Sequence, residues 1–167
     1  MRPVACLAAA AVALALVLAT GADSARAAGD GARLDPIERA IVRGINRRRA
    51  RHGLGALREV RRLARAADFH SREMLAGDYF AHASRDGSSF ATRIRRYVRA
   101  STLGETLAML WPPRREHMAR CVVSMWMHSP PHRAILLSRS FHRLGVARRT
   151  GSLGGRRACV VTADFAG

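Results

Sequence analysis

Residues 126–133 of the chain read Trp-Met-His-Ser-Pro-Pro-His-Arg, and this stretch joins a helical pattern to a rigid bend. A proline ring fixes φ near about −65° and removes a backbone donor, so the helix that carries Trp126 must end at Pro130 and Pro131. His132 is the first titratable side chain after the prolines. We therefore expect the bend to present His132, either as a ligand or proton-transfer group or as a purely structural residue.

Motifs on both sides of the bend follow one order along most of the chain. They are Asn46, Arg49, Gly53-Leu54, Leu57, Leu63, Ala67, His70-Ser71, Met74, Phe80, His82, Gly104-Glu105, Trp126, Ser129-Pro130, His132-Arg133, Phe141, Gly145-Val146 and Phe165. With these motifs the chain resembles the bacterial branch of the CAP superfamily of cysteine-rich secretory proteins, antigens and pathogenesis-related proteins, also called SCP-like extracellular domains. The resemblance extends from residue 37 to residue 165. It implies a three-layer α-β-α sandwich with a small antiparallel sheet.

Local patterns agree with an α+β fold. Helical periodicity and capping residues predict helices from Pro36 to about Gly53, from about residue 60 to Gly77, from Ser88 or Ser89, and over residues 114–128. Strand patterns follow at residues 144–147 and 158–162, joined by a glycine-rich loop over residues 150–155. We expect a core that contains Ile41, Leu63, Met74, Val122, Trp126 and Phe165.

The N-terminus is typical of a secretory signal peptide. Met1-Arg2 is cationic, residues 4–19 are apolar, and Ala25-Arg26-Ala27 forms an Ala-x-Ala cleavage site. We expect a signal peptide over residues 1–27, a linker over 28–34 and one domain over 35–167, with no transmembrane span in the mature chain. A retained N-terminal anchor is the alternative. Both interpretations place the domain outside the cytoplasm, and the first makes it a secreted protein.

Two of the three cysteines, Cys121 and Cys159, remain after the signal peptide is removed. In an oxidising compartment they could form a disulfide, which would stabilise the fold by about 3–4 kcal/mol on a chain-entropy model. Alternatively, Cys121 is a small buried apolar residue of its helix.

The net charge is +17, and all 29 basic residues are arginines, which are spread over every segment. The aromatic content of 5% is too low to provide stacking platforms among them, and no helix-turn-helix or zinc-finger spacing occurs. These observations argue against nucleic acid as the partner. Association with lipid-like or anionic envelope ligands is expected as a secondary, salt-sensitive property.

The resemblance implies that His82, Glu105 and His132 meet in the central cleft of the family. Two imidazoles and a carboxylate, completed by water, suit zinc or another divalent cation, although their spacing alone does not require a metal. The chain departs from the family at Thr106, Pro131 and Ala163, where asparagine, glycine and glutamine are usual. We therefore expect a divergent member in which part of the polar surroundings of the cleft is lost.

Two function classes follow from these residues. The leading one is a secreted binding module, and the alternative is a metal-assisted hydrolase in which Glu105 or a histidine activates metal-bound water. A serine hydrolase built on Ser129 and His132 is disfavoured by the adjacent prolines and by the lack of an orienting acid. We expect His70 to be half-buried and hydrogen-bonded. The sequence specifies no ligand, substrate, partner protein or oligomeric state.

Overall fold

The structure is a computed structural model of the 167-residue chain, and it describes residues 34–111 and 117–167. The chain divides into two units, residues 1–30 and 31–167, and the account below concerns the second. The predicted signal peptide lies outside the described residues, as does the start of the helix expected from residue 114. Within the described ranges, no helix has the length and apolar character needed to cross a membrane.

The described part of the chain contains five helices and four strands, and the last two strands form a long hairpin. The elements are α1 (Pro36–Arg51), β1 (Arg58–Glu59), α2 (Arg61–Ala76), α3 (Phe90–Arg95), β2 (Leu103–Leu110), α4 (Met118–His128), α5 (Pro130–Leu136), β3 (Arg143–Leu153) and β4 (Arg156–Ala166). Helix α1 begins where the sequence predicts, because Asp35 and Glu38 form a capping box and Pro36 occupies the first turn.

The four strands form one sheet in the order β1-β3-β4-β2. Strands β3 and β4 pair along their whole length, and Gly154 and Gly155 make the turn between them with φ of +55° and +70°. Two consecutive positive φ values match a type I′ hairpin turn, which glycine adopts without strain. The two residues of β1 pair in parallel with β3, so the sheet is mixed and not wholly antiparallel as expected.

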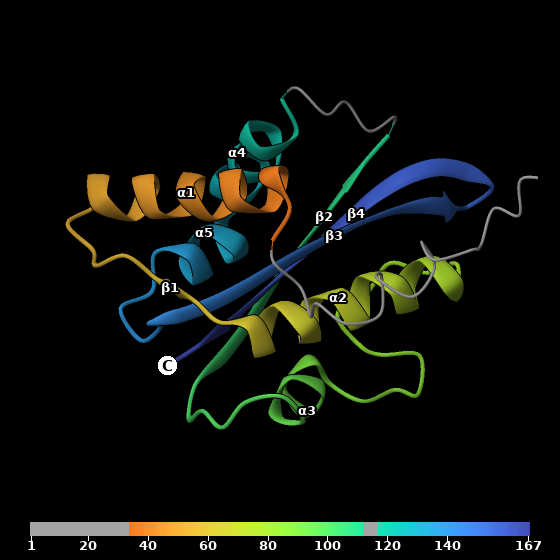
Figure 1. Ribbon diagram of the computed structural model, residues 1–167, viewed down its shortest axis with the longest axis horizontal. Coiled ribbons are helices and arrows are strands. Elements are labelled where there is room, and N and C mark those ends of the chain that lie inside the picture. Colours follow the sequence, from red (N-terminus) through yellow and green to blue (C-terminus); the bar gives the residue numbers. More distant parts are fainter. Residues whose placement is uncertain (1–33, 112–116) are drawn as a thin grey trace, which may run out of the picture. The chain divides into compact units, whose positions relative to one another are not determined.

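Helices cover both faces of the sheet and produce three layers (Figure 1). Helices α1, α4 and α5 pack on one face, and α2 and α3 on the other. The approach of α2 is close at Gly145 of β3, where a Cβ atom would lie 2.0 Å from the backbone nitrogen of Ala64. Trp126 ties α4 to the sheet, since its indole N–H donates to the carbonyl oxygen of Leu107 at 2.8 Å. The expected α+β three-layer sandwich is confirmed.

The predicted core is confirmed at every position. The six predicted residues are all at most 1% exposed: Ile41, Leu63, Met74, Val122, Trp126 and Phe165. Leu34, which the sequence places in the linker, also packs in the core at 4% exposed. The packed domain therefore begins no later than Leu34.

Some elements differ from the local sequence patterns. The prolines after α4 begin a further helix, α5, in place of an irregular bend, because they occupy its first turn, where a missing N–H breaks no helical hydrogen bond. Strand β2 was not distinguished from its surroundings in the sequence. Strands β3 and β4 extend well beyond the predicted residues and shorten the glycine-rich loop to a two-residue turn.

Both described cysteines are free thiols. Cys121 lies on the exposed side of α4, whereas Cys159 is buried on β4 with its Sγ 3.6 Å from the Sδ of Met118. Neither the disulfide nor the buried position considered for Cys121 is present, because helical periodicity turns Met118, not Cys121, toward Cys159.

Candidate functional site: a central polar cluster

The fold brings the three predicted site residues together. His82 Nδ1 lies 2.8 Å from Glu105 Oε1, and the rings of His82 and His132 have centroids 6.4 Å apart. They come from the loop after α2, from strand β2 and from the first turn of α5. With Arg93 and Asp164, described next, we call these residues the central polar cluster.

Glu105 and Asp164 place two carboxyl groups side by side in the sheet. The two residues are directly opposite each other on the antiparallel strands β2 and β4, so both side chains point to the same face. Both residues are buried, at 2% and 0% exposed. Two buried carboxylates in contact repel each other and both lack hydration, so this pair requires a compensating charge or a proton.

Arg93 of α3 supplies the compensating charge. Its guanidinium is fully buried and forms an ion pair with Glu105 Oε2. The same guanidinium donates to Ser84 Oγ at 3.0 Å and to the carbonyl oxygen of His82 at 3.2 Å. Arg93 therefore joins α3, strand β2 and the loop that carries His82.

The surroundings of Asp164 favour its protonated form. Burial raises the pKa of Asp164 well above its usual range, and the neighbouring charge of Glu105 raises it further, against a smaller opposing effect of Arg93. Neither carboxyl oxygen of Asp164 has a hydrogen-bond donor among the described residues. A neutral carboxyl group resolves this arrangement, because its O–H can donate to the Glu105 carboxylate.

Hydrogen bonds with two side chains of α2 fix the loop that carries His82. His70 is fully buried, not half-buried as expected, and its Nε2 donates to the carbonyl oxygen of Ala81 at 2.8 Å. Its Nδ1 lies 3.1 Å from Glu73, whose other carboxylate oxygen accepts from the backbone N–H of Arg85. His70 and Glu73 thus fix the backbone on both sides of His82.

His132 is held in the first turn of α5, beside but not bonded to His82. Partial burial lowers the pKa of His132, and the nearby His82 lowers it further. These surroundings favour the neutral imidazole of His132, the form that can coordinate a metal ion or accept a proton.

Two of the three departures from the family pattern lie on the other face of the sheet, and the third, Pro131, directly precedes His132. Thr106 and Ala163 are cross-strand neighbours: Thr106 follows Glu105, and Ala163 precedes Asp164. Successive strand residues point to opposite faces, so both side chains point away from Glu105 and Asp164. Pro131 is exposed in the first turn of α5. The ionisable residues are therefore assembled despite the three substitutions.

The cluster fits a metal ion only in part. Both oxygens of Glu105 are engaged, one by His82 and one by Arg93. A zinc ion bonded to both imidazoles at about 2.0–2.1 Å in tetrahedral geometry would bring the ring centroids to roughly 5.2 Å, closer than the 6.4 Å observed. In the two described ranges, no three His, Cys, Asp or Glu side chains form a group that could hold one ion.

The fold places the chain among the α-β-α sandwich domains of the SCP type, since a solved extracellular protein with such a domain shares it. A profile of the cysteine-rich secretory protein family, CAP, matches residues 42–165. The chain belongs to this family.

Several known proteins are similar to the chain. An outer surface protein of Borrelia burgdorferi has a TM-score of 0.67 at 18% identity, covering 82% of this chain and 98% of that one. An extracellular protein with an SCP domain from Bacillus anthracis has a TM-score of 0.62 at 25% identity, covering 81% and 44%. In sequence, the uncharacterized membrane protein YlbC of Bacillus subtilis is 30% identical over 110 residues. These are 65% of this chain but 30% of that relative.

Two members of the cluster were not found from the sequence. Arg93 is one of 29 basic residues, and nothing in its local pattern separates it from solvated arginines. Asp164 lies between Ala163 and Phe165 in an apolar strand, and a lone acid in such a strand could have been noted as a buried titratable group.

Proposed function

We propose that this protein is a secreted CAP-domain binding module whose central polar cluster binds a divalent cation such as zinc, or a small polar ligand, through His82 and His132. The observation that carries the proposal is the contact between His82 Nδ1 and Glu105 Oε1. Because a carboxylate oxygen accepts, Nδ1 carries the hydrogen, and in the neutral imidazole the lone pair of Nε2 is then free for a ligand. The His82 side chain is 51% exposed, so a ligand can reach it.

In this proposal Glu105 orients His82. Glu105 would itself coordinate the cation only if its ion pair with Arg93 broke. A carboxylate behind a ligating imidazole fixes its tautomer and increases its basicity, as is common in metal sites. His132 supplies the second imidazole after a shift of about 1 Å between the rings. The positive charge of Arg93 beside Glu105 lowers cation affinity, so the expected site is weak.

Export of the domain is part of the proposal. The signal-like residues 1–27 support it, as do the similar proteins described as an outer surface protein and an extracellular protein. The net charge of +17 supports association with lipid-like or anionic envelope ligands. N-terminal sequencing of exported protein should give a chain that starts near residue 28, and an intact Met1 on cytoplasmic protein would contradict export.

The cluster is tested by calorimetric titration of the mature protein with zinc chloride. The wild type should bind one ion, and His82→Ala or His132→Ala should each weaken that binding at least tenfold. The matched control is His142→Ala, which removes an exposed histidine elsewhere in the domain. Equal binding by all four proteins would refute the cation proposal.

The same variants distinguish the hydrolase alternative. Zinc-dependent turnover of ester or peptide substrates that disappears in His82→Ala would favour a metal-assisted hydrolase. Binding of zinc without turnover would favour the binding module.

A further inference from the structure

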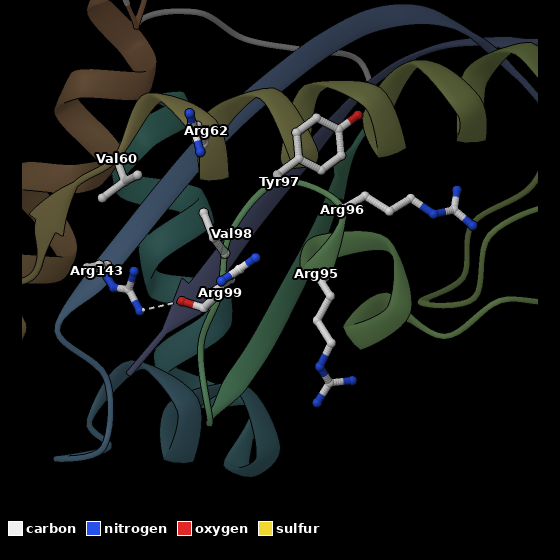
Figure 2. Close-up of a pocket in the computed structure, with 8 residues that line it drawn as sticks. All are labelled: Val60, Arg62, Arg95, Arg96, Tyr97, Val98, Arg99 and Arg143. Carbon is white, nitrogen blue, oxygen red and sulfur yellow. Dashed lines mark hydrogen bonds between the residues drawn. The ribbon is translucent and has the colours of Figure 1, made fainter.

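A second site lies at the end of α3, where a groove of about 480 Å³ is lined almost entirely by arginine and apolar side chains. The arginines are Arg62, Arg95, Arg96, Arg99 and Arg143. They come from three segments that are distant in sequence: the start of α2, the end of α3 with the loop that follows, and the first residue of β3 (Figure 2). No Asp or Glu side chain of residues 34–111 and 117–167 lines the groove.

The charge of the groove is poorly compensated within the described residues. Among the described residues, the side-chain carboxylate paired with these arginines is that of Asp86, which lies 3.8 Å from Arg96 in a pair whose side chains are both more than half exposed. Such an exposed pair contributes little, since water screens it. Arg143 also contacts Gly167, the last residue of the given sequence. The arginines other than Arg143 therefore favour an anion between them.

One of the arginines is fixed in position by the backbone. Arg143 Nη2 donates at 2.7 Å to an oxygen of Gly167, the last residue of the given sequence. It also donates at 3.3 Å to the carbonyl oxygen of Arg99, the contact drawn in Figure 2. These bonds hold a half-buried guanidinium at one end of the groove. A guanidinium held in this way loses less side-chain entropy when it binds an anion.

The rest of the lining is apolar. Val60, Tyr97 and Val98 complete it, with Val98 buried and the other two partly exposed. A cationic rim around apolar side chains suits an anionic group attached to a less polar body. Arginine binds phosphate through paired N–H donors, and the volume is in the range of small-ligand sites.

We propose that this arginine groove binds phosphate groups, with an anionic phospholipid headgroup or a soluble phosphate compound as the source. The groove contains no residue of the central polar cluster, so the proposal is independent of the site assigned to His82 and His132. It rests on the proposed association with anionic ligands and assigns that association to one groove. Its failure would leave the site at His82 and His132 untouched.

The test is cosedimentation of the mature protein with phosphatidylcholine vesicles that contain or lack phosphatidylglycerol, combined with titration of inorganic phosphate followed by NMR. The groove variant is Arg95→Gln/Arg99→Gln. The control is Arg65→Gln/Arg157→Gln, which removes the same charge from exposed positions outside the groove. A further variant, Arg62→Gln, probes the wall formed by α2.

Phosphatidylglycerol vesicles should bind the wild type and the control within about threefold of each other. The groove variant should bind roughly 30-fold more weakly, since each basic residue at an anionic surface contributes about fivefold. The His82→Ala/His132→Ala variant should bind like the wild type. Groove-dependent phosphate binding without vesicle binding would support the site and assign a soluble source. Equal weakening of groove variant and control, or no binding of either probe, would overturn the proposal.

Discussion

Replacement of Arg93 by methionine tests the electrostatic account of the central polar cluster. The substitution keeps an unbranched apolar stem but removes the guanidinium that pairs with Glu105 and donates to Ser84 and to the His82 carbonyl. It leaves the Glu105 carboxylate buried beside Asp164 with His82 as its remaining partner. Breaking a buried ion pair in this way costs about 3–5 kcal/mol, and we expect a loss in that range.

The free energy of unfolding is measured by urea denaturation with the fluorescence of buried Trp126 as the signal. The matched control is Arg95→Met, two positions along the same helix but exposed, which should change stability by at most about 0.5 kcal/mol. The double variant Arg93→Met/Glu105→Gln removes both charges. It should be more stable than Arg93→Met alone, because no uncompensated carboxylate remains.

A loss below about 1 kcal/mol for Arg93→Met would refute this account. So would a double variant that is less stable than the sum of the two single substitutions predicts. Either result would mean that water reaches Glu105 and compensates its charge.

The remaining predictions concern the site histidines, the first helix and the thiols. The double variant His82→Ala/His132→Ala should lose less than about 1.5 kcal/mol of unfolding free energy, since both side chains are partly exposed. Each truncation of a core residue to alanine, by comparison, costs about 2–5 kcal/mol. Unfolding of the wild type on addition of EDTA would instead reveal a structural metal. For Asp35, burial alone would raise the pKa, but hydrogen bonds from the Glu38 N–H and from Arg148 outweigh it and the net pKa is lowered. Its stabilisation is therefore present above about pH 4 and lost as pH falls through the lowered value, so Asp35→Ala should lose about 1 kcal/mol at pH 7 and little at pH 2 in chemical denaturation. Cys121 is exposed and should react with a thiol reagent in the native protein. Cys159 should react only after unfolding, because it is buried and burial raises the pKa of its thiol. Equal reactivity of the two thiols in the native protein would contradict this packing.

Much of the fold could be predicted from local sequence because its physical causes are local. The capping residues of α1 and the stop of α2 at Gly77 act within one helical turn. The core residues follow from periodicity, since an apolar side chain on a helix face must be buried wherever that helix packs. The ordered motifs also identified His82, Glu105 and His132 as neighbours, and the structure brings them together.

Strand pairing was decided only by the tertiary structure. Strand β2 has no clear alternation, and its assignment depends on the register that sets Glu105 opposite Asp164. That register creates a buried pair of carboxyl groups which neither segment shows alone. Arg93 then differs from its exposed neighbour Arg95 because the docking of α3 turns one toward the carboxyl pair and leaves the other in solvent.

The arginine groove has the same origin. Each of its arginines looks like an ordinary solvated residue in the sequence, and three separate segments must pack before they surround one hollow. Composition alone determined that the protein is strongly basic, but charge is a sum over residues and carries no position. Where charges meet, and whether a carboxylate neutralises them, depends on distances across the fold, because Coulomb interactions and desolvation act through space and not along the chain.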